Sequence, residues 1–271
     1  MRIARIATPT GPQAVLAEGD RWLAIDDPFE DQPIPTGATW ALEDVRLLAP
    51  VEPRVVLGML HNSGPADRAL APQAFLKSAR TVVGPGAAIV VDPRRGQVMA
   101  ECELALVVGR PCRNVSVADA PAFVWGWTIG NDVTAVDQTA ADETRTQAKN
   151  GDGFTPLGPW VETDLAALDV ALTAAVDGVE AVASSTAALA WNPFEALSHL
   201  SGHLTLGPGD VILTGAPGTA FAITPGVEAT CAVAGIGVLS NPVHTLEVTP
   251  GPPTVSACSS ALRSSRGSAR W

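Results

Sequence analysis

Glycine and proline interrupt this chain every few residues, and they limit the structures that it can form. The 271 residues include 25 glycines and 23 prolines. Proline lacks the backbone N–H that a helix interior needs, and glycine loses the most conformational entropy on folding, so both disfavour long helices. Short apolar runs lie between these breaks, such as RVVLGML at 54–60 and MAECELALVVG at 99–109. The pattern predicts many short strands and therefore a mainly β fold.

The apolar runs also predict how the chain is divided. RIARIA, VLAEG, RWLAID and VRLLAP indicate a small β-rich N-terminal domain over residues 1–50. Residues 51–248 contain the remaining strand-like runs, and this length suffices for one sizeable core. Residues 249–271 are rich in serine, proline and arginine, which is typical of a disordered tail.

Two segments carry helix signals. The clearer one begins at Asn192, which suits an N-cap, and continues with Pro193 at the first helical position and Gly202 near the end. The second lies within 115–124, where Ser116 and Asp119 have the spacing of a capping box.

The composition excludes several classes of protein. A net charge of -11 argues against a nucleic-acid partner, because a phosphate backbone requires a basic surface. No run approaches the ~18 apolar residues of a membrane span. The opening MRIARIATPT lacks the apolar stretch of a signal peptide. We therefore expect a cytoplasmic protein that acts on a small molecule, without a membrane or nucleic-acid partner.

Glu101 and Glu103 lie two residues apart on a predicted strand. Side chains at that spacing project from one face, while Cys102 projects from the other. The apolar residues that follow indicate a half-buried setting, where two carboxylates repel each other unless a cation lies between them. The pair is also typical of a solvent-exposed acidic face, so by itself it indicates a metal site only weakly.

Asp132 and Lys149 occupy two further settings that suit a polar site. Asp132 ends an apolar strand, where an Asn-Asp dipeptide is also an ordinary turn former. Beside two glutamates it would complete an oxygen-only ligand set, which suits Mg²⁺ or Mn²⁺ better than Zn²⁺. Lys149 is one of only two lysines in the chain, the other being Lys77. Its ammonium could hold a substrate oxygen beside a metal, and the alternative is a solvated surface lysine.

The order and spacing of these motifs resemble the fumarylacetoacetate hydrolase family over about residues 54–243. The matching stretches are VVLGM, VVGPGAAI, ECELALVVGR, GWTIGNDVTAVD, AKNGDGFTPLGPW, LTLGPGDVILTGAPG and GIGVLSNPV. The resemblance implies a mainly β (α+β) fold, with a mixed β-roll or sandwich catalytic domain, a smaller N-terminal domain and a homodimer. It places the metal ligands at Glu101, Glu103 and Asp132, and it places Lys149 beside a bound Mg²⁺ or Mn²⁺.

The sequence departs from the family where a lid normally supplies a general base. Many members carry a G-x-N-Y-x-x-H-x-x-E stretch, whose His and Glu form the base dyad. Aligned on Gly58, this chain reads GMLHNSGPAD, so Gly64 stands at the His position and Asp67 at the Glu position. Glycine cannot accept a proton, which leaves Asp67 and the displaced His61 as candidate catalytic bases. The alternative for His61 is a loop histidine that hydrogen-bonds to backbone.

The predicted substrate pocket also departs from the family. Val136 stands where many members have an arginine that grips a substrate carboxylate, and Thr139 stands in place of a glutamine. Ala216 replaces the second threonine of the usual T-G-T-P loop, in which Thr214, Gly215 and Ala216 are expected to line the pocket. These changes predict weaker binding of anions and a substrate larger or less charged than oxaloacetate.

The leading hypothesis is a divalent-metal-dependent hydrolase that cleaves a C–C bond in a 1,3-dicarbonyl or 2-oxo-acid substrate, such as an acylpyruvate. The metal would bind two adjacent oxygens and stabilise the enolate that forms. Without a base, a decarboxylase or a tautomerase (a lyase or an isomerase) is the alternative, since neither reaction needs an activated water. The remaining alternatives are a biosynthetic cyclase or aldol-type enzyme and a non-catalytic binding protein.

Overall fold

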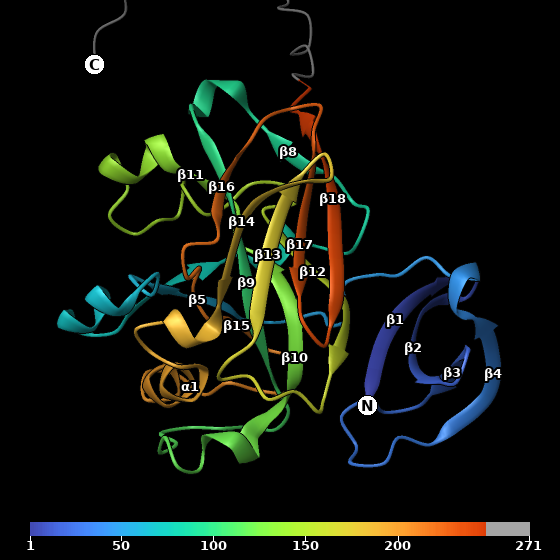
Figure 1. The fold of residues 1–271 in the computed structure, drawn as a ribbon. Helices are drawn as coiled ribbons and strands as arrows, with labels where there is room; N and C mark the ends of the chain where they lie inside the picture. The colour runs from blue at the N-terminus through green and yellow to red at the C-terminus, as the bar shows by residue number, and fades with distance from the viewer. Residues whose placement is uncertain (248–271) are drawn as a thin grey trace, which may run out of the picture.

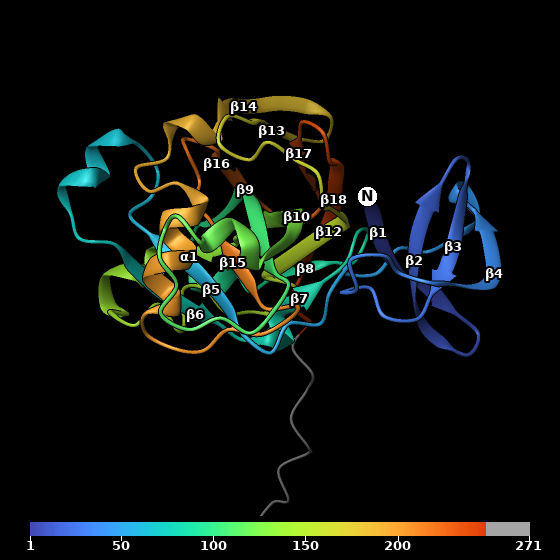
Figure 2. The same cartoon turned by 90° about the horizontal axis from the view of Figure 1, so that it is seen from below.

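The computed structural model describes residues 1–247, and most of its regular structure is β (Figures 1 and 2). The larger sheet has the strand order β4-β3-β2-β1-β12-β10-β9-β15-β5-β6, and the smaller one has the order β14-β13-β17-β18-β8. These two sheets confirm the predicted mainly β fold. The predicted tail at 249–271 lies outside the described residues.

The N-terminal part of the chain forms an antiparallel meander, drawn in blue to one side of the molecule (Figure 1). Its strands are β1 (Arg2–Thr8), β2 (Gly11–Glu18), β3 (Arg21–Ile25) and β4 (Pro35–Ala41). The meander joins the rest of the larger sheet because β1 pairs with β12 (Thr155–Glu162). The Trp22 and Trp160 rings, with centroids 6.2 Å apart, pack beside this junction. A small β-rich N-terminal domain is therefore present, as predicted.

The long strand β9 (Val98–Val108) lies at the centre of the larger sheet. It pairs with β10 (Val124–Asn131) on one side and with β15 (Val211–Leu213) on the other. Its first half also pairs with two short strands that lie off the main path. The remaining strands of this part are β5 (Val56–Leu60), β6 (Gln73–Lys77), β7 (Val82–Val83), β11 (Thr134–Ala135) and β16 (Ala220–Ile223).

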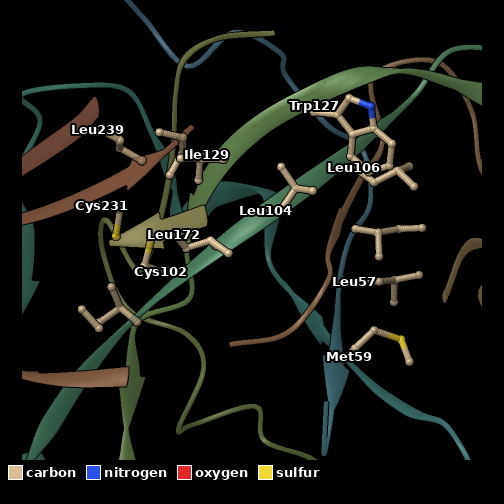
Figure 3. Packing of buried hydrophobic residues seen from close by; sticks show 14 of the residues in the cluster. Leu57, Met59, Cys102, Leu104, Leu106, Trp127, Ile129, Leu172, Cys231 and Leu239 are labelled. Atoms are coloured by element: carbon tan, nitrogen blue, oxygen red, sulfur yellow. The ribbon is translucent and has the colours of Figure 1, made fainter. Parts of the chain in front are cut away.

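The smaller sheet covers one face of β9 and encloses the main core. Its strands are β8 (Ile89–Val91), β13 (Ala171–Val176), β14 (Val179–Ser185), β17 (Glu228–Val233) and β18 (Gly237–Thr245). Cys102 and Leu104 of β9 point into this core and lie among Leu172, Cys231 and Leu239 (Figure 3). Since side chains alternate along a strand, Glu101 and Glu103 project from the opposite face of β9, as the sequence predicts.

The one α-helix among residues 1–247 is α1 (Pro193–Ser201), which follows the clearer of the two helix signals. The Asn192 side chain accepts hydrogen bonds from the backbone of Phe194 and Glu195, and the Glu195 carboxylate accepts one from the Asn192 backbone. This capping box satisfies N–H groups that the helix leaves unpaired.

The remaining helical segments are short 3-10 helices. One of them lies within the segment 115–124, so the second helix signal gives a 3-10 helix there and not an α-helix, because the chain enters β10 directly after it. The 3-10 helices are η1 (Leu42–Asp44), η2 (Pro65–Ala69), η3 (Ala79–Thr81), η4 (Pro93–Arg95), η5 (Ala120–Phe123), η6 (Val136–Ala141) and η7 (Thr186–Ala188). Among residues 1–247, no helix is long and apolar enough to cross a membrane.

Replacing the N-cap tests how much α1 depends on its capping box. We expect Asn192→Ala to lower the free energy of unfolding by about 1 kcal/mol, because two helix N–H groups lose their acceptor. Urea unfolding followed by circular dichroism measures this change. Asn192→Asp keeps an acceptor oxygen and is the matched control, so equal losses in both variants would contradict the capping role.

Candidate active site

The pairing of β9 with β10 brings the three predicted metal ligands together. In the antiparallel register Glu103 lies opposite Gly130, and Cys102 lies opposite Asn131. Asp132 follows directly, and its backbone N–H donates to the carbonyl of Glu101 at 2.9 Å. The carboxylate oxygens of Glu101, Glu103 and Asp132 lie within 4.8 Å of one another. A shift of one residue in this register would place the side chains on opposite faces and separate the group.

Asp132 is fully buried and lies between two lysines. Its Oδ2 accepts a hydrogen bond from Lys149 Nζ, and its Oδ1 accepts one from Lys77 Nζ. Lys149 Nζ also donates to Glu101 Oε2 at 3.0 Å and lies 4.5 Å from the centroid of the Phe75 ring. Phe75 can lie there only because residue 58 is glycine: a Cβ on Gly58 would come within 2.1 Å of the ring.

Lys77 is the site residue that the sequence prediction missed. It comes from β6, 55 residues before Asp132, and its side chain is completely buried. Besides Asp132, its Nζ donates to the carbonyls of Phe154 at 2.7 Å and Val133 at 3.2 Å, so all three of its donors are used. The signal that could have found it is the scarcity of lysine, since both lysines of the chain lie in this one cluster.

Burial and the neighbouring charges together shift the pKa of every member of the cluster. Burial opposes ionisation of Asp132, but Lys149 and Lys77 outweigh it and lower the pKa of this carboxyl. Burial likewise opposes the charged form of Lys149, and Asp132 and Glu101 outweigh it and raise the lysine pKa. Burial raises the pKa of Glu101 and Glu103, and neighbouring carboxylates add to the effect. Burial also lowers the pKa of Lys77. If all five groups are ionised, three carboxylates face two ammonium groups, and burial of the two glutamates opposes that state unless a cation is bound.

Of the three carboxylates in the triad, Glu103 has the fewest hydrogen-bond and ion-pair partners. It is 2% exposed, and among residues 1–247 its side chain accepts one hydrogen bond, from the Gly215 backbone N–H at 2.7 Å, and forms no ion pair. A buried carboxylate beside two others needs a cation to remain ionised. A hard divalent cation with oxygen ligands, Mg²⁺ or Mn²⁺, fits this donor set. The cluster reaches solvent through Glu101, whose side chain is 21% exposed.

The lid segment, defined as residues 61–70, packs through Asn62, and not through its candidate bases, against the loop beside Glu103. Asn62 is buried, and its amide donates to the carbonyls of Trp191 and Thr214. The Asn62 carbonyl lies so close to Gly215 that a Cβ there would approach it to 2.3 Å, and Gly215 has a φ of 109°. The lid is therefore packed against the same glycine whose N–H binds Glu103.

The two candidate bases occupy exposed or partly exposed positions in the lid. His61 is exposed, has a φ of 53°, and its side chain forms no hydrogen bond with another described residue. Asp67 lies in η2, and its carboxylate accepts a hydrogen bond from the Ser63 backbone at 2.8 Å. Arg68 fixes the lid to α1 by pairing with Glu195 at 2.8 Å and lying over the Trp191 ring.

The predicted pocket residues divide into two groups. One group, Thr214, Gly215 and Ala216, is buried beside Glu103. The Thr214 hydroxyl donates to the Leu104 carbonyl at 2.6 Å, so this hydrogen bond fixes the loop to β9. Val136 and Thr139 lie in η6, and the Thr139 hydroxyl donates back to the Val136 carbonyl at 2.7 Å. Figure 1 shows the lid in cyan and η6 in yellow-green, projecting on the side opposite to the N-terminal domain.

Comparison with known families agrees with this arrangement. Residues 54–244 match the family described as fumarylacetoacetate (FAA) hydrolase C-terminal, and residues 1–50 match the family Rv2993c-like, N-terminal. The chain belongs to the fumarylacetoacetate hydrolase family. The resemblance found in the sequence motifs is thereby confirmed.

Several individual proteins are similar to this family member. Protein Rv2993c of Mycobacterium tuberculosis is 37% identical over 265 residues, which cover 90% of this chain and 98% of the relative. The crystal structure of 5-carboxymethyl-2-hydroxymuconate delta-isomerase from Mycobacterium smegmatis is 39% identical, has a TM-score of 0.86, and covers 91% of this chain and all of that one. A maleylpyruvate hydrolase from Sphingobium sp. SYK-6, solved with manganese(II) and pyruvate, shares the fold at 22% identity and a TM-score of 0.76, over 91% of this chain and all of that one.

Removing the charge of Glu103 tests the metal site directly. We expect Glu103→Gln to weaken Mn²⁺ binding at least about tenfold, because the ligand set loses an anionic oxygen of its buried triad. Isothermal titration calorimetry with the full chain measures the affinity. Glu52→Gln is the control, since Glu52 is 77% exposed and pairs with Arg5. Equal Mn²⁺ affinity in both variants would contradict the assignment.

Replacing Lys77 tests whether the buried ion pair supports the fold. In the absence of divalent cations, we expect Lys77→Met to lower the free energy of unfolding by about 3 kcal/mol, because Asp132 loses one of its two buried counter-charges. Urea unfolding measures the loss. A loss below about 1 kcal/mol would show that the pair is not desolvated in solution.

Proposed function

We propose that this protein is a divalent-metal-dependent enzyme that stabilises the enolate of a 2-oxo acid or a 1,3-dicarbonyl compound. The observation that supports this most strongly is the buried carboxylate triad with a lysine at its edge. A triad of oxygens with excess negative charge favours Mg²⁺ or Mn²⁺, and Lys149 adds a fixed positive charge beside it. A non-catalytic binding protein would have no need of this costly buried cluster.

The residues of the cluster have separate tasks in this proposal. A divalent cation held by Glu101, Glu103 and Asp132 would supply a Lewis acid for two adjacent substrate oxygens. Lys149 remains protonated, because Asp132 and Glu101 raise its pKa, so its ammonium can hold the negative charge of an enolate oxygen. Lys77 has no free donor and therefore acts by positioning Asp132.

The residues of the lid favour an isomerase (tautomerase) or a decarboxylase as the activity of this protein. Gly64 stands where the family's base dyad has histidine, His61 is exposed, and Asp67 is hydrogen-bonded within the lid. Neither reaction requires an activated water as nucleophile. Decarboxylation forms the enolate by loss of CO2 and needs no base for that step, whereas tautomerisation needs a group that moves a proton between carbon and oxygen, and this group need not stand at residue 64. The similarity to the delta-isomerase of Mycobacterium smegmatis supports this outcome.

A hydrolase that cleaves a C–C bond, the hypothesis first drawn from the sequence, is the second candidate. The observation in its favour is that His61 precedes Asn62, which packs against Gly215 beside Glu103. A small movement of the lid would bring the imidazole toward the triad, where it could activate water. A cyclase or aldol-type activity, the homodimer and the cytoplasmic location stay predictions from the sequence.

Substrate turnover separates the two outcomes. The panel comprises oxaloacetate, acetylpyruvate and a bulkier acylpyruvate, each assayed with Mg²⁺ and with chelator. We expect chelator-sensitive tautomerisation or decarboxylation, and we expect His61→Ala to keep this rate within about threefold, because no nucleophilic water is needed.

The same variant, His61→Ala, also tests the hydrolase candidate. A hydrolase that uses this imidazole should lose at least about a hundredfold in kcat for acylpyruvate cleavage. His244→Ala, at an exposed position of β18, controls for the loss of a histidine as such. Turnover that is insensitive to chelator would contradict the metal-dependent function as a whole.

A further inference from the structure

Strand β6 contacts the buried cluster through two of its side chains. Phe75 and Lys77 lie two residues apart and are both buried, so they project from the same face of the strand. The Lys77 ammonium pairs with Asp132. The Phe75 ring lies against the other lysine of the chain, and Lys149 Nζ is 4.5 Å from the centroid of this ring. One strand therefore contacts both the central carboxylate of the cluster and the lysine at its edge.

The neighbouring strand fixes the position of the Phe75 ring. Gly58 of β5 lies opposite Phe75 in the antiparallel register. The ring fills the space beside this glycine, since a Cβ on Gly58 would come within 2.1 Å of its Cζ and 2.5 Å of its Cε2. Phe75 is 6% exposed. The pairing of β5 with β6 therefore holds the ring in place without any contribution from Lys149.

The hydrogen bonds of Lys149 involve the same carboxylates that are expected to bind a divalent cation. Its Nζ donates to Glu101 Oε2 at 3.0 Å and to Asp132 Oδ2. A divalent cation on the triad would coordinate these oxygens, and it would repel the ammonium because both carry positive charge. The Phe75 ring attracts the ammonium through the negative face of its π-system and offers no oxygen to a hard cation. The contact between Phe75 and Lys149 can therefore persist while the hydrogen bonds are weakened.

We propose that Phe75 is a positioning residue whose ring keeps the Lys149 ammonium at the edge of the site when a divalent cation is bound. The contact is desolvated, since both residues are buried, and a cation–π contact is strongest in that setting. A leucine at this position would fill the space and would not attract the ammonium. The inference rests on the proposed function and deepens it, because it identifies the group that aims Lys149 at a developing enolate oxygen.

The presence of only two lysines in the chain allows the contact to be observed directly. In the NMR spectrum of the full chain with isotope-labelled lysine, the ε-methylene signals come from Lys77 and Lys149 alone, and Lys149→Arg assigns them. Protons above the face of an aromatic ring are shifted upfield by its ring current. We expect the Lys149 ε-methylene signal upfield of its ordinary position in the metal-free protein, and we expect it to remain there after saturation with diamagnetic Mg²⁺.

Changing the electronic character of the ring separates the cation–π contact from packing. A phenylalanine analogue with three ring fluorines, introduced at residue 75 alone, weakens the negative face of the ring with little change in shape. Isothermal titration calorimetry then measures Mn²⁺ affinity, and the affinity of the Mn²⁺-loaded chain for pyruvate, a small 2-oxo acid. We expect pyruvate to bind about three- to tenfold more weakly, because the ammonium no longer stays beside the bound anion. Mn²⁺ affinity should be unchanged or higher, because the ammonium that repels the cation can move away.

Two further proteins complete the comparison. Phe75→Leu keeps an apolar side chain without an aromatic face, and it should show the same loss of pyruvate affinity. The fluorinated analogue at Phe221 is the matched control, because this ring is buried in the main core and 5% exposed, and no lysine or arginine of residues 1–247 lies over it. The control should leave both affinities unchanged.

The possible results distinguish this inference from the proposed function. Movement of the Lys149 signal to its ordinary position on Mg²⁺ binding would overturn the role of Phe75 and leave the metal-dependent function standing. Unchanged pyruvate affinity in the protein fluorinated at residue 75, or equal losses of Mn²⁺ and pyruvate affinity, would overturn it as well. A protein that binds neither Mg²⁺ nor Mn²⁺ would overturn both. The Lys149 signal is measured without pyruvate, so it decides the inference by itself.

Discussion

The buried Asp132 carboxylate, held between the ammonium groups of Lys77 and Lys149, is the interaction on which the rest of the structure depends. An isolated charge cannot remain buried, so each of these groups requires the others. The three residues come from β6, the end of β10 and the loop before β12, and the cluster therefore ties three separate parts of the larger sheet to one point. The further carboxylates of Glu101 and Glu103 make this cluster able to hold a cation.

The buried cluster and the segments around it differ in how freely their side chains can change. The triad and both lysines form one largely buried cluster, where a change of one side chain leaves a buried charge without a partner. The lid and η6 project from the surface (Figure 2), and their exposed side chains, unlike that of the buried Asn62, can change without disturbing the core. The departures at Gly64, Val136 and Thr139 lie in these projecting segments, whereas Ala216 is buried in the loop whose Gly215 N–H binds Glu103. Departures from the family pattern therefore occur both beside the candidate metal site and in the segments that project from the molecule.

Local signals in the sequence predicted local structure well. The capping box of α1 and the alternating side-chain directions along β9 involve neighbouring residues, so they can be recognised without knowledge of the fold. The contribution of Lys77 is not local, because it lies 55 residues from Asp132 and nothing in its own strand indicates its partner. The segment 115–124 shows the reverse case: the Ser116 hydroxyl accepts the Asp119 N–H as in a capping box, but a turn and a four-residue 3-10 helix follow, since the chain enters β10 directly afterwards.

The sequence by itself determined the mainly β fold, the family, and the candidate ligand set Glu101, Glu103 and Asp132, because these depend on residue types at fixed spacings along the chain. The tertiary structure decided which groups surround that set. Only the register of β9 with β10 brings the three carboxylates within 4.8 Å, and only the docking of β6 places a second lysine against Asp132. Burial then shifts the pKa of each group, and burial is a property of the packed molecule that no single segment specifies.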